Sequence, residues 1–268
     1  MLASLALMFM APGALAWRQW PDPQRDDSDA DRDGGDYREG RDGRDYRDGR
    51  DGRDDRDRGQ PIPAQVDYRA LERAVLDEMN LFRKDPRAYV AKLEAVRDAM
   101  RGNLIMREGE TPIATQEGVS AVNEAIAVLS RASRRLPRFA HSNGLADAAR
   151  EHADDLAQSG ALGHDGTDGS SPDQRVSRHG RWVNMVAENI AFGPTTAEDI
   201  VVGLIIDDGV ADRGHRDILL EGQLFFAGVA CGPHPSYGTT CVIDYATGLE
   251  TGPMRKPRNN WRPNMGPE

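Results

Sequence analysis

Cysteine is scarce in this chain of 268 residues, which contains only Cys231 and Cys241. Two cysteines cannot build a dense disulfide framework, nor can they supply a four-cysteine zinc site. They flank a stretch with glycine and proline, so they either close the end of a hairpin as a disulfide or remain two free thiols on neighbouring strands. Because the chain begins with a segment typical of export, and a disulfide needs an oxidising compartment, we expect the bridge.

Several familiar signatures are also absent. The sequence contains no HExxH, the helical motif of many zinc proteases, and no GxSxG, the nucleophile elbow of many hydrolases. The net charge of -10 leaves no basic face, so we expect no nucleic-acid partner. The apolar run at residues 1–16 is too short for a membrane span, and we expect no transmembrane segment in the mature chain.

Both ends of the chain differ in composition from its middle. Residues 1–16 are apolar and end in Ala-Leu-Ala, a pattern typical of signal-peptide cleavage. No basic residue precedes this run, so either the true start lies upstream or the run is an uncleaved apolar end; we favour export, with a mature chain from Trp17. Residues 17–60 carry 11 Arg and 15 Asp or Glu with few apolar groups, which predicts a disordered linker or a spacer for wall contacts. Residues 251–268 are predicted to be a flexible tail.

The stretch between these ends, residues 61–250, is predicted to form one α+β domain, because helical patterns come first and strand-like runs follow. Apolar residues recur at helical spacing in five segments, at about residues 68–82, 86–100, 119–129, 142–159 and 195–206. Two polar, glycine-containing stretches are expected to be loops, at residues 101–115 and 160–183. β-branched and aromatic residues predict three strands, at about residues 185–192, 225–231 and 239–245.

Two histidines and several carboxylates carry the chemical content of this domain. His164 lies in a Gly-His-Asp-Gly turn, Glu188 in an otherwise apolar run, and His215 follows the acidic pair Asp207 and Asp208. Two imidazoles with carboxylates suit a divalent transition metal, and the same groups could perform general acid–base catalysis. The structural alternatives are a helix-capping role for His164, a loop-holding role for Glu188 and a plain helix-end role for Asp207.

Six segments follow one another between about residues 66 and 247: LADAAREHADDLAQSG, GHDG, AENIAFG, an apolar helix, RGHRDIL and FAGVAC. In this order they resemble the CAP superfamily of cysteine-rich secretory proteins, antigen 5 and pathogenesis-related 1, in its bacterial secreted SCP-like branch. The resemblance implies a three-layer α-β-α sandwich with a small antiparallel sheet. It also implies a central cleft with two histidines and two acidic residues, which map to His164, Glu188, His215 and Asp207, with Asp208 as the alternative second acid.

The resemblance also bears on function. Several family members bind zinc in this cleft, which implies Zn²⁺ or another divalent cation on His164 and His215. Three functions remain open: a secreted or periplasmic binding module for a lipid, glycan or cell-wall component, a metal- or His/Glu-dependent hydrolase of peptide or peptidoglycan, and a structural or signalling protein with a vestigial cleft. The lack of a recognisable nucleophile favours the binding module. Residues 101–135 look inserted relative to minimal family members, and could add a helix over one face.

Overall fold

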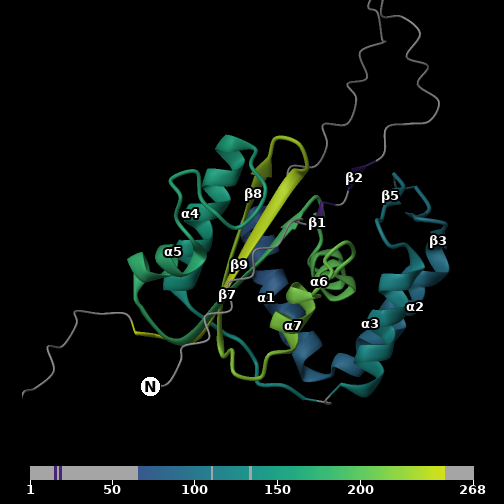
Figure 1. The fold of residues 1–268 in the computed structure, drawn as a ribbon, viewed down its shortest axis with the longest axis horizontal. Helices are drawn as coiled ribbons and strands as arrows, with labels where there is room; N and C mark the ends of the chain where they lie inside the picture. Colours follow the sequence, from purple (N-terminus) through teal and green to yellow (C-terminus); the bar gives the residue numbers. More distant parts are fainter. Residues whose placement is uncertain (1–14, 17, 20–65, 110, 133–134, 251–268) are drawn as a thin grey trace, which may run out of the picture. The chain divides into compact units, whose positions relative to one another are not determined.

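Five strands form the central sheet, in the order β1-β7-β9-β8-β6 (Figure 1). A computed structural model of the chain describes residues 15–16, 18–19, 66–109, 111–132 and 135–250. Three long antiparallel strands make up most of the sheet: β7 (Arg181–Phe192), β8 (Phe226–His234) and β9 (Gly238–Glu250). Two short strands lie parallel to their neighbours at the edges: β1 (Leu15–Ala16) beside β7 and β6 (Ala140–His141) beside β8.

Helices cover both faces of this sheet (Figure 1). One layer contains α4 (Asn143–Ser159) and α5 (Pro172–His179). The opposite layer contains α1 (Tyr68–Lys84), α6 (Ala197–Ile206) and α7 (Gly214–Leu220). Beyond it lie the 3₁₀ turn η1 (Pro86–Tyr89), α2 (Val90–Ala99) and α3 (Val119–Arg131). The predicted three-layer α-β-α sandwich with a small antiparallel sheet is therefore confirmed.

The alternation of side chains along the strands explains why both faces are covered. On one face, three small or aliphatic residues of α4 pack against an apolar row of the sheet: Ala149, Ala153 and Leu156 meet Ile190, Phe192, Ala230 and Val242. On the other face, Tyr245 of β9 donates a hydrogen bond from Oη to Met79 Sδ of α1 at 3.2 Å. Both rows are buried, so the strands read as apolar runs in the sequence.

Helix α4 is capped at both ends, by Ser142 at its start and by Gly160 at its end. The Ser142 hydroxyl accepts a hydrogen bond from Leu145 N at the start of the helix, which satisfies one of the free N–H groups of its first turn. Gly160 ends the helix in the left-handed conformation, with φ of 68°. The loop that follows contains His164.

Two loop predictions are wrong. Residues 101–115 include parts of a second sheet, in which β3 (Met100–Arg101), β4 (Leu104–Ile105) and β5 (Ile113–Ala114) join β2 (Arg18–Gln19). Residues 160–183 include α5, which starts with a capping box between Ser171 and Gln174 and with Pro172 in its first turn. An eight-residue helix holds barely two turns, too few to show a period in the sequence.

The predicted disulfide is confirmed. Cys231 and Cys241 are bonded and lie directly opposite each other on β8 and β9, three residues inside the hairpin end and fully buried. No helix in the described part of the chain is long and apolar enough to cross a membrane. Residues 1–14, most of the predicted linker at 17–60, and the predicted tail at 251–268 lie outside the described residues.

Candidate functional site

His164 and Glu188 form the first half of the candidate site. Glu188 lies on β7 and points toward the α4–α5 layer, where its Oε1 meets His164 Nδ1 at 2.7 Å. The carboxylate is fully enclosed, with 1% of its side chain exposed, whereas 21% of the His164 side chain is exposed. His164 therefore connects a buried charge to solvent.

Arg175 of α5 completes this half, and sequence reasoning missed it. Its Nη2 binds Glu188 Oε2 at 2.7 Å and the carbonyl oxygen of His164 at 2.9 Å, and its Nη1 binds Ser170 O at 2.7 Å. Burial would raise the pKa of Glu188, but the hydrogen bond to His164 and the charge of Arg175 lower it overall. Glu188 is therefore an ionised carboxylate whose two oxygens are both occupied.

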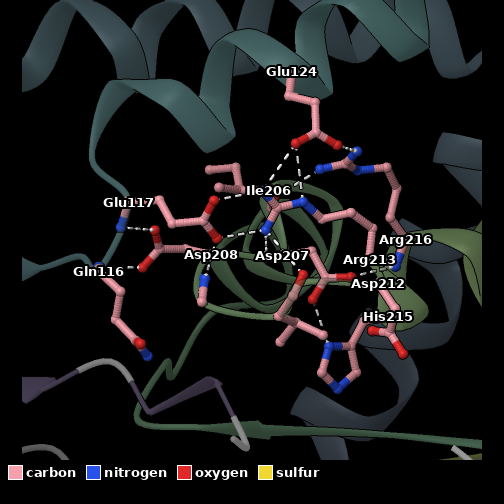
Figure 2. Close-up of polar contacts among 12 residues, drawn as sticks. Gln116, Glu117, Glu124, Ile206, Asp207, Asp208, Asp212, Arg213, His215 and Arg216 are labelled. Atoms are coloured by element: carbon pink, nitrogen blue, oxygen red, sulfur yellow. Dashed lines mark hydrogen bonds and ion pairs between the residues drawn. The ribbon is translucent and has the colours of Figure 1, made fainter.

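His215 and Asp207 form the second half, on the opposite layer of the sandwich. His215 Nδ1 meets Asp207 Oδ1 at 2.6 Å, and Arg216 N donates to Asp207 Oδ2 at 3.1 Å (Figure 2). Asp207 ends α6 with φ of 57°, and an aspartate tolerates this left-handed conformation better than most residues. Asn189 of β7 donates to the carbonyl oxygen of His215 at 3.3 Å and thereby ties α7 to the sheet.

The second acid of the site is Asp207 rather than Asp208. Asp208 points the other way and accepts hydrogen bonds from Gln116 N at 2.6 Å and Glu117 N at 2.8 Å (Figure 2). Its carboxylate thus satisfies two backbone N–H groups ahead of α3. Of the two adjacent aspartates, Asp207 is therefore the one that pairs with His215.

The two halves meet across β7. The ring centroids of His164 and His215 lie 6.5 Å apart, with 34° between their planes. A carboxylate occupies the Nδ1 of each ring, so Nε2 is the nitrogen that each ring can offer to a ligand. Metal-ligating histidines show this arrangement, with a carboxylate that sets the tautomer and the ring orientation, and so do general-base histidines.

This donor set fits a divalent cation on two imidazoles. In the described residues no group of three or more His, Cys, Asp and Glu is arranged to hold a metal. A cation on His164 and His215 would therefore complete its coordination with water or with groups of a bound ligand. The four sequence-predicted residues are thus brought together as two histidine–carboxylate pairs.

The profile of the Cysteine-rich secretory protein family, CAP, matches residues 76–245, which is most of the folded part of the chain. The chain belongs to the CAP family. No curated protein matches the sequence closely enough to count.

Two solved structures resemble this CAP domain. One is an extracellular protein with an SCP domain from Bacillus anthracis str. Ames, with 23% identity, a TM-score of 0.35 and coverage of 41% of this chain and 34% of that one. The other is an outer surface protein from Borrelia burgdorferi, with 18% identity, a TM-score of 0.36 and coverage of 41% and 78%. The match thus spans about a third of the first structure's length.

An ion-pair network supports the His215 half of the CAP site (Figure 2). The buried guanidinium of Arg216 donates to Ile205 O at 2.6 Å and Ile206 O at 2.9 Å, and reaches Glu124 of α3 at 2.8 Å. Arg213 binds both oxygens of Glu117 at 2.6 Å and the carbonyl oxygen of Asp207 at 2.7 Å. The turn between α6 and α7 is therefore held by Glu117 and Glu124, which the sequence did not connect to the site.

Proposed function

We propose that this CAP domain is an extracytoplasmic binding module in which His164 and His215 hold a divalent cation such as Zn²⁺. The observation that carries the proposal is the pair of imidazoles 6.5 Å apart, each with Nδ1 on a buried carboxylate. Two ligands leave coordination positions open for a group of a lipid, glycan or cell-wall component. The cation would supply a Lewis-acidic positive charge there.

The chain's own residues set the geometry for such a cation. Glu188 and Asp207 fix the tautomer of each imidazole, because a carboxylate at Nδ1 requires the proton on that nitrogen. Arg175 and Arg216 in turn hold Glu188 and Asp207 through an ion pair and a backbone N–H, respectively. The ligand nitrogens are thus preorganised, which reduces the entropic cost of binding.

An extracytoplasmic location is part of the proposal. The buried disulfide between Cys231 and Cys241 supports it, since such bonds persist in oxidising compartments. The apolar run at residues 1–16 with its Ala-Leu-Ala ending supports it as well.

Hydrolysis is a second candidate, which one observation favours. His164 is bonded to an ionised carboxylate and remains partly exposed, as a general base requires. A histidine–carboxylate pair of this kind could activate water directly or beside a metal. Activity of the zinc-loaded chain on peptide or peptidoglycan, lost in Glu188→Gln while zinc binding persists, would favour this candidate over the binding module.

Zinc titration by calorimetry tests the proposal on the full chain after treatment with a chelator. We expect micromolar or tighter binding, weakened at least tenfold by His164→Ala and by His215→Ala. His141→Ala is the matched control, because His141 is exposed and its ring forms a hydrogen bond with Asn143 on the surface. Unchanged zinc affinity in both site variants, or no zinc binding by the folded wild type, would overturn the proposed cation site.

A further inference from the structure

Asp244 is a buried carboxyl group without a hydrogen-bond donor. It lies on the central strand β9, directly opposite Glu188 of β7 on one side and Gly228 of β8 on the other. The residue is completely buried, and neither carboxyl oxygen has a donor among the described protein groups. Such a group normally costs several kcal/mol unless it is paired or neutral.

Glu188 and Asp244 are direct partners in the register of β7 and β9, so their side chains lie next to each other on the same face of the sheet. Two ionised carboxylates directly opposite each other on neighbouring strands repel, and burial strengthens this repulsion. Glu188 already uses one oxygen for His164 and the other for Arg175. A contact between Asp244 and Glu188 is a hydrogen bond only if one of the two carboxyl groups carries a proton.

Among the described residues, a single arginine brings a permanent positive charge to both members of this pair. Arg175 is the buried cation that faces both carboxyl groups, from α5. From α4, His152 also faces Glu188; its Nε2 is bonded to Gly163 O at 2.9 Å, and burial lowers its pKa, so it is neutral. On β8, Gly228 brings no side chain.

The remaining polar neighbours of Asp244 do not supply a second positive charge. Tyr245, the next residue on β9, is neutral because burial raises the pKa of its phenol well above the usual range. Arg83 of α1 faces Tyr245 and is committed to the carbonyl oxygens of Pro137, Leu219, Glu221 and Leu224. Glu188 has the donors, so Asp244 is the member of the pair that must be neutral.

We propose that Asp244 carries a proton at neutral pH and donates it as a hydrogen bond to Glu188, so that the buried pair holds one proton and one negative charge. Asp244 is then a positioning residue: it fixes Glu188, which in turn orients the His164 ring. Burial first, and the charge of Glu188 second, raise the pKa of Asp244 well above its ordinary value, which supports the assignment.

The pair has a definite effect on stability. The pKa of Asp244 is raised in the folded state, whereas an unfolded aspartate titrates near pH 4 (about 3.9). The folded state therefore binds the proton more tightly, and the protein loses stability as pH rises from about 4 toward the folded pKa. Asparagine has the same shape, donates an N–H and does not titrate, so Asp244→Asn removes this loss.

Carbon NMR of the wild-type chain with ¹³C-labelled aspartate tests the proton directly. We expect one carboxyl signal to keep the shift of a protonated acid at pH 6, and Asp244→Asn to remove that signal. Asp165→Asn, at an exposed position in the His164 turn, is the control that leaves it in place. If every aspartate of the folded wild type is ionised at pH 6, the proposal is wrong, whether or not any variant folds.

Denaturant unfolding between pH 4 and 8 provides the second readout. We expect Asp244→Asn and the wild type to have similar equilibrium constants of unfolding near pH 4. With each pH unit above 4, the ratio of the variant's constant to that of the wild type should fall by up to tenfold. Asp244→Ala, which cannot donate, should be less stable than Asp244→Asn at every pH. Equal pH profiles of the wild type and Asp244→Asn would overturn the proposal.

Only the consequence for His164 rests on the proposed function. Zinc titration separates the claim about the proton on Asp244 from the claim about the cation site. If Asp244 is neutral, Asp244→Asn should keep the zinc affinity of the wild type within about twofold, because asparagine is also neutral and donates a hydrogen bond. A larger loss of affinity would mean that Asp244 acts as a charge and would contradict the assignment. A wild type that binds no zinc would overturn the cation site alone and leave the carboxyl signal as the test of Asp244.

Discussion

Gly228 is the position at which the smallest change should disturb the sandwich most. It lies on β8 opposite Asp244, and a Cβ added there would stand 2.0 Å from the backbone nitrogen of Ala146 and 2.3 Å from the carbonyl carbon of Leu145. Both atoms belong to the backbone of α4, so no side chain can rotate away. The backbone of Gly228 is not in the left-handed region, so the clash alone decides the outcome.

The magnitude follows from how far α4 must retreat. An ordinary Cβ contact begins at 3.4 Å, so the helix must move by about 1.4 Å away from the sheet. A gap of ~0.5–1 Å already removes a quarter to a half of a dispersion contact, and α4 packs against the sheet along its whole buried stripe. We expect Gly228→Ala to cost about 3–5 kcal/mol, above the usual range of ~1–3 kcal/mol for overpacking.

Thermal and urea unfolding followed by circular dichroism measure this cost. For a domain of this size, the loss corresponds to a decrease of about 6–20 °C in Tm. Gly222→Ala is the matched control, because nothing lies within 4 Å of its Cβ position and its backbone is not left-handed. If Gly228→Ala is as stable as Gly222→Ala, the close approach of α4 to β8 is not what the structure describes.

Two further predictions concern the disulfide and an ion pair. Reduction of Cys231–Cys241, a loop of 10 residues, should lower the free energy of unfolding by about 2–3 kcal/mol, seen as a lower urea midpoint in reductant; equal midpoints would contradict it. The hydrogen bond from Arg213 is the main cause that lowers the pKa of Glu117 to about 2. The ion pair with Arg213 therefore stabilises the folded state fully above about pH 4.3, and this contribution is lost as pH falls toward 2. Arg213→Gln should make the free energy of unfolding depend less on pH in this range. Arg181→Gln, which removes an exposed ion pair, should leave the pH dependence unchanged.

The layers of the fold could be predicted because long segments repeat their pattern several times. Helix α1 buries six of its 17 residues, among them apolar residues at helical spacing. Helix α5 could not be found in this way, because its eight residues include only Arg175 and Val176 as buried positions. Arginine is usually exposed, so the sequence alone predicts that Arg175 lies at the surface.

The pairing within the site depended on backbone conformation that no residue pattern reports. Asp207 and Asp208 are adjacent and chemically identical, yet one faces His215 and the other binds backbone N–H groups just ahead of α3. The left-handed turn at Asp207 separates them. The Asp-Asp-Gly sequence is compatible with such a turn, but it does not say which of the two residues adopts it.

Glu188 and Asp244 show most clearly what the sequence can and cannot tell. Each is a carboxylate with apolar residues close by in the sequence, and that signal was used for Glu188 alone. Their proximity follows from the register of β7 and β9, which places residues 56 positions apart directly opposite each other. A shift of the register by one residue would turn Asp244 to the other face of the sheet, so no local pattern could reveal the pair.

The two histidines of the site are therefore supported in different ways. The His164 half depends on buried charge, with one arginine shared by two carboxyl groups, and it should respond to the proton on Asp244. The His215 half depends on backbone conformation, because Asp207 is held by an N–H group and a left-handed turn that α3 clamps from outside through Arg213 and Arg216. Glu188 and Asn189, neighbours on β7, bond to His164 and to the backbone of His215, so this strand links the two halves. A change in one layer should then affect a cation bound by both rings through the imidazole of that layer alone.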